Sequence, residues 1–331
     1  MKKIASILFF FIRILTLNYK FARKKNTLII FVFHKVSDLK TTFHSPLPVE
    51  TYEKLVLFLK KYYNIIHVKD ISSYFFENKN DKPAAIITFD DGLADIKEFV
   101  LPIMEKYNVK FNINIDTEIL ETKKPQDFLK IYDILNESQP DYYFDEDYMK
   151  DKIQIKDSSP FNVEDQFTQV LSGLSLIDRR KFIDKFVNSL NYKGNYYGVL
   201  SVSDIKLLSE NKLVEFGSHS HTHTVLTQLE KKELVFELLH SKMKIQKAVN
   251  QNIDIIAYPN GQFNEQVDLT SLNVGYKYLL KSENKINVIN SYLPTSYYRI
   301  NQYHESFEIS IAYTYGLLSF IKKIYGRLFN S

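Results

Sequence analysis

Three of the chain's eight histidines lie within five consecutive residues, at His219, His221 and His223. A second unusual segment is an apolar run that ends in two adjacent carboxylates, Asp90 and Asp91. Two histidines with one carboxylate form a known catalytic zinc set, which leaves a coordination position open for water. The second carboxylate would then be free to act as a general base. Together the two segments predict a hydrolytic metal site.

The histidine cluster also has structural interpretations, because alternate residues share one face of a strand and an i, i+4 pair shares one face of a helix. Downstream, residues 227–230 (Thr-Gln-Leu-Glu) have the pattern of a capping box that opens an apolar-periodic helix over residues 229–249. The histidines are therefore expected in a turn between a strand and this helix, where ligands can point into a cleft. We expect His219 and His223 to bind metal and His221 to be a wall or outer residue.

The elements that must position these residues alternate between short apolar strands and amphipathic helices. Strands are predicted at residues 28–33, 64–68, 84–89, 109–115, 213–216, 253–258, 276–280 and 297–300. Such alternation predicts a parallel sheet with helices outside it. Polar residues follow or end several of these strands, namely His34, Asp90 and Asp91, Asp116, His219, Pro259 with Asn260, and Arg299. In a barrel the carboxyl ends of the strands share one face, so these side chains would converge there.

Residues 121–195 interrupt this rhythm, because they contain no clear strand. Residues 121–170 carry twelve acidic and six basic side chains, and helical patterns appear at 161–171 and 176–190. We interpret the segment as a helical insertion. It is expected either to cap the site and contact substrate or to be a solvated addition to the domain.

Composition limits the remaining possibilities. The chain has 331 residues and 45% hydrophobic content, enough for one large α/β domain or two ordinary ones. Cysteine is absent, so nitrogen and oxygen atoms must hold any metal. The net charge is +4, with seven basic residues in 1–25 and three in 317–331, which leaves the middle net acidic. This distribution argues against nucleic-acid binding and predicts that the ends meet an anionic membrane surface.

The N-terminal apolar stretch, residues 4–17, is interrupted by an arginine and is shorter than the ~20 residues that a spanning helix needs. Basic residues on its far side oppose export, which favours an interfacial helix on the cytoplasmic face over an exported or membrane-anchored protein. The predicted organisation is a membrane-associated segment at 1–26, a domain at 27–305 and an amphipathic C-terminal helix at 306–331. That last helix would lie on the membrane or pack on the domain.

Two segments resemble motifs of the polysaccharide deacetylases, the family with a NodB-homology domain known as carbohydrate esterase family 4. Residues 88–92 (Thr-Phe-Asp-Asp-Gly) are similar to the family's first motif, and residues 219–223 fit its second, H-[S/T]-x-x-H. Looser likeness begins at residues 33–36 (Phe-His-Lys-Val) and extends to Ile300. The resemblance implies an irregular (β/α) barrel of about seven to eight strands, related to the TIM barrel, with a helical insertion.

The resemblance also implies a chemistry. Asp91, His219 and His223 would hold a divalent metal, with Zn²⁺ expected, and Asp90 would be the general base. The substrate would be an N-acetylated sugar of a polysaccharide or of a lipid-linked glycan intermediate, from which the enzyme removes acetyl.

The third motif of the family, R-x-P-[Y/F]-G, is only partly kept, because the arginine that would orient the base is missing. Arg299 is a candidate to supply that charge, and we expect the substrate groove to be lined by Tyr258, Pro259, Asn260 and Gly261. The rigid proline and glycine suggest a wall whose backbone N–H could stabilise an oxyanion.

The histidine that protonates the leaving amine in the family has no clear counterpart. His304 and His34 are the candidate acids, beside Asp90 acting after proton transfer. Three alternatives therefore stay open: a non-catalytic NodB-like glycan-binding protein, a deacylase acting on an O-acyl group, and an amidohydrolase that uses His219 with His221.

Overall fold

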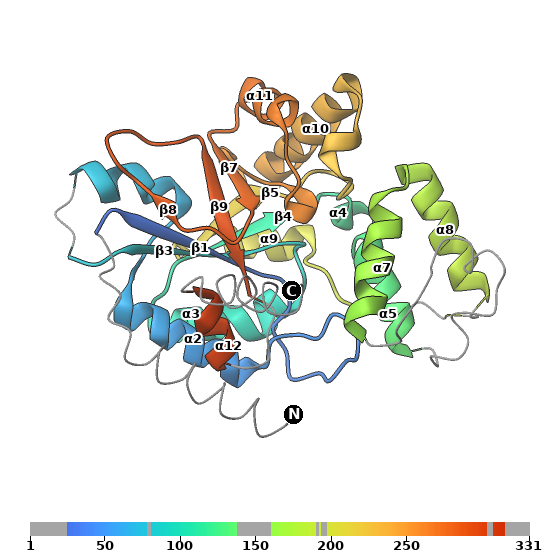
Figure 1. Cartoon of the computed structure of the whole chain (residues 1–331), viewed down its shortest axis with the longest axis horizontal. Coiled ribbons are helices and arrows are strands. Elements are labelled where there is room, and N and C mark those ends of the chain that lie inside the picture. The colour runs from blue at the N-terminus through green and yellow to red at the C-terminus, as the bar shows by residue number, and fades with distance from the viewer. Residues whose placement is uncertain are drawn as a thin grey trace, which may run out of the picture.

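The computed structural model describes residues 25–77, 81–137, 160–189, 192, 197–302 and 307–314. Its centre is a closed ring of parallel strands in the order β1-β3-β4-β5-β6-β7-β9 and back to β1 (Figure 1). These strands are β1 (Thr27–Phe33), β3 (Ala84–Phe89), β4 (Phe111–Ile115), β5 (Val214–Ser218), β6 (Ile255–Ala257), β7 (Tyr278–Ser282) and β9 (Ser296–Asn301). The predicted irregular barrel is confirmed.

Two short strands flank this ring. β2 (Asn64–Ile65) pairs parallel with β3, and β8 (Asn287–Val288) pairs antiparallel with β1. The strand predicted over 64–68 is too long, because the chain turns into a 3₁₀ helix at Val68–Asp70. β8 was not predicted, because two residues cannot show the alternating pattern of a half-buried strand.

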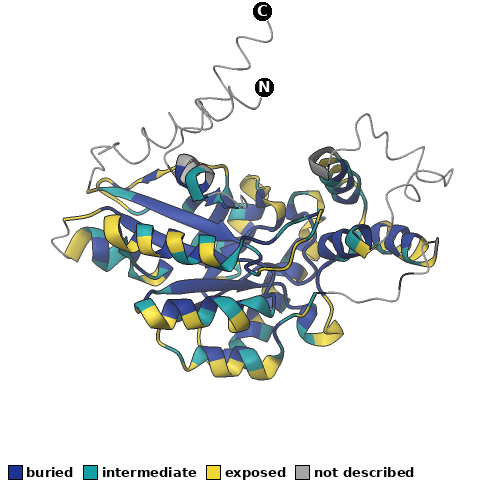
Figure 2. Ribbon diagram, turned by 90° about the horizontal axis from the view of Figure 1, so that it is seen from below, coloured by how far each residue is buried: buried dark blue, intermediate teal, exposed yellow. Residues whose placement is uncertain are grey.

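Helices surround the barrel, and in Figure 2 their exposed faces point away from the buried strands. The described ones on the barrel are α2 (Val49–Tyr62), α3 (Leu101–Tyr107), α4 (Ile119–Thr122), α9 (Val202–Ser209), α10 (Lys231–Val249), α11 (Glu265–Asn273) and α12 (Phe307–Thr314), with π-helical turns at Ser73–Glu77 and Ile96–Val100. The predicted helix over 229–249 is confirmed, but its predicted capping box is wrong. Residues Leu226–Gln228 form a 3₁₀ turn, and the helix is capped instead by Glu230 with Glu233.

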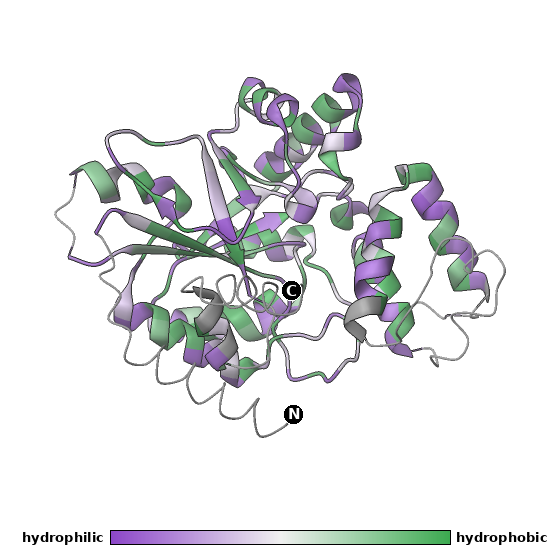
Figure 3. Cartoon of the chain, in the orientation of Figure 1, coloured by the Kyte–Doolittle hydropathy of each residue, from purple (hydrophilic) through white to green (hydrophobic). Residues whose placement is uncertain are grey.

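The core has two sides, because successive residues of a strand point to opposite faces. Along β1, Leu28 and Ile30 belong to one buried cluster, whereas Ile29, Phe31 and Phe33 belong to another that includes the helices. Figure 3 shows β1 as a mainly hydrophobic segment at the centre of the molecule. The same alternation decides which side chains near the carboxyl end of a strand point into the ring.

The helical insertion is confirmed for the residues described, and it lies to the right of the barrel in Figure 1. It consists of α5 (Asp127–Glu137), α7 (Pro160–Ser172) and α8 (Leu176–Ser189). These helices share a hydrophobic cluster of their own, which includes Phe167, Phe182 and Phe186, and Leu93 of the barrel side joins it. The insertion is therefore packed against the domain.

None of the helices within the described ranges is long and apolar enough to cross a membrane. The start of the expected C-terminal helix, α12, packs on α2, with the ring of Phe307 edge-on to Phe58 at 6.1 Å between centroids. Residues 315–331, and all but the last two residues of the segment 1–26, lie outside the described residues.

Candidate active site

A cavity of about 420 Å³ opens at the carboxyl ends of the barrel strands. Its barrel wall includes the predicted polar residues His34, Asp90, Asp91, His219, His223 and Arg299. The wall opposite comes from the insertion and from the loop after β1, with Gln126, Phe128, Leu129, Tyr132, Thr168, Ser172 and His44. The barrel has thus brought together residues from distant parts of the sequence, and the insertion encloses them.

The two adjacent carboxylates sit on a sharp turn after β3. Asp91 and Gly92 both have a left-handed backbone, with φ of 69° and 64°. This conformation is unfavourable for most residues with a side chain and natural for glycine, and a Cβ at position 92 would also lie 2.8 Å from Cδ1 of Ile119. The tight turn keeps both Asp90 and Asp91 buried at the cavity wall.

The histidine loop follows β5 and is also bent, with left-handed φ values at Ser220 (66°) and His223 (53°). Nδ1 of His219 lies 2.8 Å from the carbonyl oxygen of Ala257, so an N–H there can donate to it and leave Nε2 with a lone pair. Nε2 of His219 is 3.7 Å from Oδ1 of Asp91, and Nε2 of His223 is 3.5 Å from the same oxygen. The three predicted ligands therefore converge.

The donor set of this cluster fits a divalent cation. One ligand atom each from Asp91, His219 and His223 can be chosen so that all lie within 4.8 Å of one another. Oδ1 of Asp91 is buried without a hydrogen-bond partner. Burial, and then the negative charge of Asp90, raises the pKa of Asp91 to about 8. A cation would relieve both penalties, because it stabilises the carboxylate and accepts lone pairs from neutral imidazoles.

Asp90, unlike Asp91, is held in its ionised state. Its Oδ1 accepts hydrogen bonds from Arg299, at 2.8 Å to the guanidinium nitrogen, and from the side-chain amide of Asn114, also at 2.8 Å. Burial alone would raise the pKa of Asp90, but the Arg299 guanidinium and then His219 outweigh it and keep that pKa well below its usual range. The carboxylate therefore remains ionised, as a base must.

Arg299 is fully buried, and it reaches Asp90 because β9 lies beside β1 and β1 beside β3. The charge that the third motif lacks thus comes from another strand. Asn114 was missed by the sequence reasoning. The alternation of Asn112 and Asn114 within an otherwise apolar strand was the available clue, since two buried amides need partners inside the barrel.

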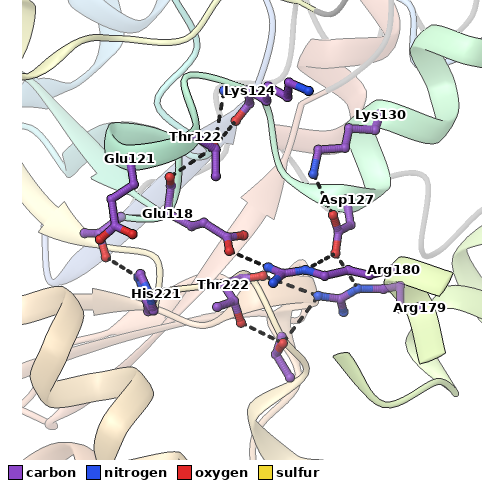
Figure 4. Close-up of polar contacts among 12 residues, drawn as sticks. Glu118, Glu121, Thr122, Lys124, Asp127, Lys130, Arg179, Arg180, His221 and Thr222 are labelled. Atoms are coloured by element: carbon purple, nitrogen blue, oxygen red, sulfur yellow. Dashed lines mark hydrogen bonds and ion pairs between the residues drawn. The ribbon is translucent and has the colours of Figure 1, made fainter. Parts of the chain in front are cut away.

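Two further buried side chains hold the histidine loop. Oε2 of Glu237, on α10, accepts from the backbone N–H groups of His221 (2.8 Å) and Thr222 (2.9 Å). From the other side, Arg179 of α8 donates to the carbonyl oxygen of Thr222 at 3.3 Å and pairs with Asp127 at 3.0 Å (Figure 4). Sequence reasoning missed both, because a charged residue in an amphipathic helix is normally assigned to solvent.

The remaining predicted residues have different environments. The hydroxyl of Tyr258 donates to Asp268 at 2.9 Å and lies 3.3 Å from the hydroxyl of Ser271, so it is engaged on the α11 side although the residue lines the cavity. Asn260 and Gly261 line the cavity in a 3₁₀ turn that begins at Pro259.

Of the two candidate acids, His34 lies in the cavity wall and His304 lies outside the described residues. Burial lowers the pKa of His34 to about 4, against the opposing charge of Asp90. His221 is directed elsewhere, toward Thr117, with its Nδ1 2.9 Å from the threonine hydroxyl.

Comparison with known proteins gives the class of this fold. A Streptococcus pyogenes deacetylase, PplD, solved with acetate, is similar with a TM-score of 0.54 and 15% identity over 84% of this chain and 92% of that chain. A de-N-acetylase of Aggregatibacter actinomycetemcomitans is similar with a TM-score of 0.53 and 16% identity, over 82% of this chain and 94% of that chain. IcaB from Ammonifex degensii is similar with a TM-score of 0.58 and 11% identity, over 87% of this chain and 97% of that chain. At these identities the likeness establishes a shared fold, that of barrel deacetylases.

In sequence, no curated protein matches the chain. Residues 183–279 match the family model described as polysaccharide deacetylase, a stretch that contains the histidine loop but not the Asp90–Asp91 turn. The chain is thus similar to the polysaccharide deacetylases in this part of its sequence and in its barrel fold.

Proposed function

We propose that the protein is a zinc-dependent N-deacetylase that releases acetate from an N-acetylated sugar. The observation that carries this proposal is the division of labour between two adjacent carboxylates in one cavity. Asp91 joins His219 and His223 in a cluster that suits a cation, whereas Asp90 is kept ionised by Arg299 and Asn114.

Bound at Asp91, His219 and His223, zinc would supply Lewis acidity toward the acetamide carbonyl and would acidify the attacking water. Asp90 would take the proton of that water. Its Oδ1 is occupied by Arg299 and Asn114, which leaves Oδ2 to face the reaction, 3.7 Å from Nε2 of His219. Because both donors hold the carboxylate in place, the base needs no reorganisation at the moment of attack.

The leaving nitrogen must receive a proton, and we assign that step to His34. It lines the same cavity as Asp90, and the two side chains interact electrostatically. Since burial keeps His34 neutral near pH 7, it would take up the proton released through Asp90 before it passes one to the amine.

Substrate selection would be shared between barrel and insertion. A cavity of about 420 Å³ is of ligand size, and Asn260, Gly261 and Tyr132 stand at its walls. Two consecutive left-handed residues, Asn260 (φ 54°) and Gly261 (φ 67°), shape the turn beside the cluster. We propose the sugar of a polysaccharide or of a lipid-linked glycan as substrate.

The basic ends of the sequence support a further proposal, peripheral binding to the cytoplasmic face of a membrane. Sedimentation with vesicles tests this proposal. Binding to anionic but not to neutral vesicles, weakened by salt, is expected, and equal recovery in the supernatant with both would reject it.

The decisive experiment follows acetate release from N-acetylglucosamine oligomers together with bound zinc. Asp90→Asn should keep zinc and lose turnover, by about 10²–10⁴-fold for loss of general base catalysis. His219→Ala should lose both. An O-acetylated sugar, assayed in parallel, distinguishes an O-deacylase, and zinc binding with no turnover on either substrate would favour a glycan-binding protein instead.

A further inference from the structure

His221 is the one residue of the histidine cluster that the proposed reaction does not use. It is 8% exposed, and its backbone N–H is fixed by Glu237. Its ring packs at 4.5 Å between centroids against His240, which lies on α10. In Figure 4 the side chain of Glu121, from α4, points toward His221. Three metal-ligating side chains thus meet on the outside of the histidine loop.

We propose that His221, His240 and Glu121 form a second divalent-cation site, distinct from the catalytic cluster. One ligand atom from each of the three can be chosen so that all lie within 4.8 Å of one another. The residues come from three elements, the loop after β5, the middle of α10 and the short helix α4. Small side-chain rotations would bring such atoms to the spacing of a cation's ligands, with water completing the coordination.

The orientation of His221 supports this role. Its Nδ1 lies 2.9 Å from Oγ1 of Thr117, a buried residue. When Nδ1–H donates to this oxygen, Nε2 carries the lone pair that a metal requires, and the ring is held in place. Metal-binding histidines commonly have such a partner on the second nitrogen. The ring of His240 is likewise fixed, stacked on Phe236 at 4.8 Å with an interplanar angle of 21°.

The donor set indicates the class of cation. Two imidazoles and one carboxylate suit Zn²⁺, Cu²⁺, Ni²⁺ or Co²⁺ rather than Mg²⁺ or Ca²⁺, which prefer oxygen ligands. The Lys244 ammonium contacts the Glu121 carboxylate, so a cation must displace it. This competition, together with the exposure of Glu121, should make the outer site weaker than the catalytic one.

Occupation of the outer site would connect α4 and α10 to the loop that carries His219 and His223. His221 is two residues from each of them, so the cation would brace that loop from the side opposite the cavity. The site does not depend on the proposed reaction, and its test uses metal binding alone.

Equilibrium dialysis of the full chain against zinc, with the metal counted per chain, tests the proposal. We expect two zinc ions for the wild type, one for His219→Ala and one for His240→Ala. In the His219→Ala background, His240→Ala or Glu121→Gln should weaken the remaining zinc by at least about tenfold. Lys244→Gln should instead strengthen the binding of this zinc ion, because it removes the ammonium that competes for Glu121. Misfolding cannot produce an increase in affinity.

His67→Ala is the matched control, because it removes a partly buried histidine that belongs to neither cluster. The Nε2 atom of His67 contacts the backbone carbonyl oxygen of Lys212. It should leave both zinc ions unchanged. Visible spectra of the Co²⁺-loaded His219→Ala protein should lose their intensity on His240→Ala. If His240→Ala binds as much zinc as the wild type, with the same affinity, the outer site does not exist. Failure of the catalytic cluster would appear differently, as no change on His219→Ala.

Discussion

Replacing Arg179 with methionine tests whether the helical insertion holds the histidine loop in place. Arg179 is 1% exposed and pairs with Asp127, which is 2% exposed, at 3.0 Å. It also donates to the carbonyl oxygen of Thr222 and to the hydroxyl of Thr224, both at 3.3 Å. Methionine fills a similar volume but can make none of these contacts.

The expected cost follows from these contacts. Removing one partner of a buried ion pair costs about 3–5 kcal/mol, because the other charge stays buried. Here Lys130 also contacts Asp127, at 2.8 Å, which places the electrostatic cost near the lower end. Two lost hydrogen bonds add about 1 kcal/mol each at most, given their length. We expect the free energy of unfolding to fall by about 3–5 kcal/mol.

The neighbouring Arg180 provides a matched control on the same helix. Its side chain is 41% exposed, pairs with Glu118 and has its Nε 3.9 Å from Oδ2 of Asp127. Asp127 keeps its closer partners Arg179 and Lys130 in the Arg180→Met variant, and contacts of such an exposed side chain contribute about 0–1 kcal/mol, so the free energy of unfolding should change by no more than that. Urea unfolding of both variants measures the difference.

A second measurement separates loop positioning from general stability. Because Thr222 lies next to His223, Arg179→Met should weaken zinc binding about 10–100-fold in the folded protein, and the Arg180 variant should not. Equal effects of the two substitutions on stability and on zinc affinity would refute the reasoning.

Three further predictions concern the barrel side of the site. Arg299→Met should raise the pKa of Asp90, because the guanidinium that opposes the effect of burial is then gone. The acidic limb of the kcat profile should therefore shift upward by about 1–3 pH units. A uniform loss of kcat with no shift would indicate a structural role only. Because the pKa of Asp91 is raised to about 8, zinc binding near pH 7 should release about one proton. As the pH is raised toward 8, zinc affinity should therefore increase about tenfold per pH unit. Calorimetry in buffers of different ionisation enthalpy measures this release, which Asp91→Asn should abolish. Gly217→Ala should lower the free energy of unfolding by about 1–3 kcal/mol, measured with urea, because its Cβ would lie 2.2 Å from Oδ1 of Asn114. It should also lower turnover, since Asn114 donates a hydrogen bond to Asp90. The control Gly173→Ala meets its nearest atom at 3.5 Å and should change stability by less than about 0.5 kcal/mol.

Much of the fold could be predicted from local pattern. The apolar runs of β1, β3 and β9 were found almost to the residue, and the insertion helices α7 and α8 followed from periodicity. These features depend on the side-chain alternation of a strand or the period of a helix, which a short stretch of sequence displays completely. Where the signal was two residues long, as in β8, or where two capping patterns competed, prediction failed.

The sequence by itself identified the candidate ligands Asp91, His219 and His223 and the candidate base Asp90, because these residues lie in two short motifs whose residue types favour that chemistry. Only the tertiary structure decided how these groups are charged and held. Arg299 lies 209 positions from Asp90, and Glu237 and Arg179 come from separate helices. Their contacts arise when the ring of strands closes and the insertion packs on it. No local pattern encodes which buried charge will meet which, since that pairing is set by strand order and by the packing of distant elements.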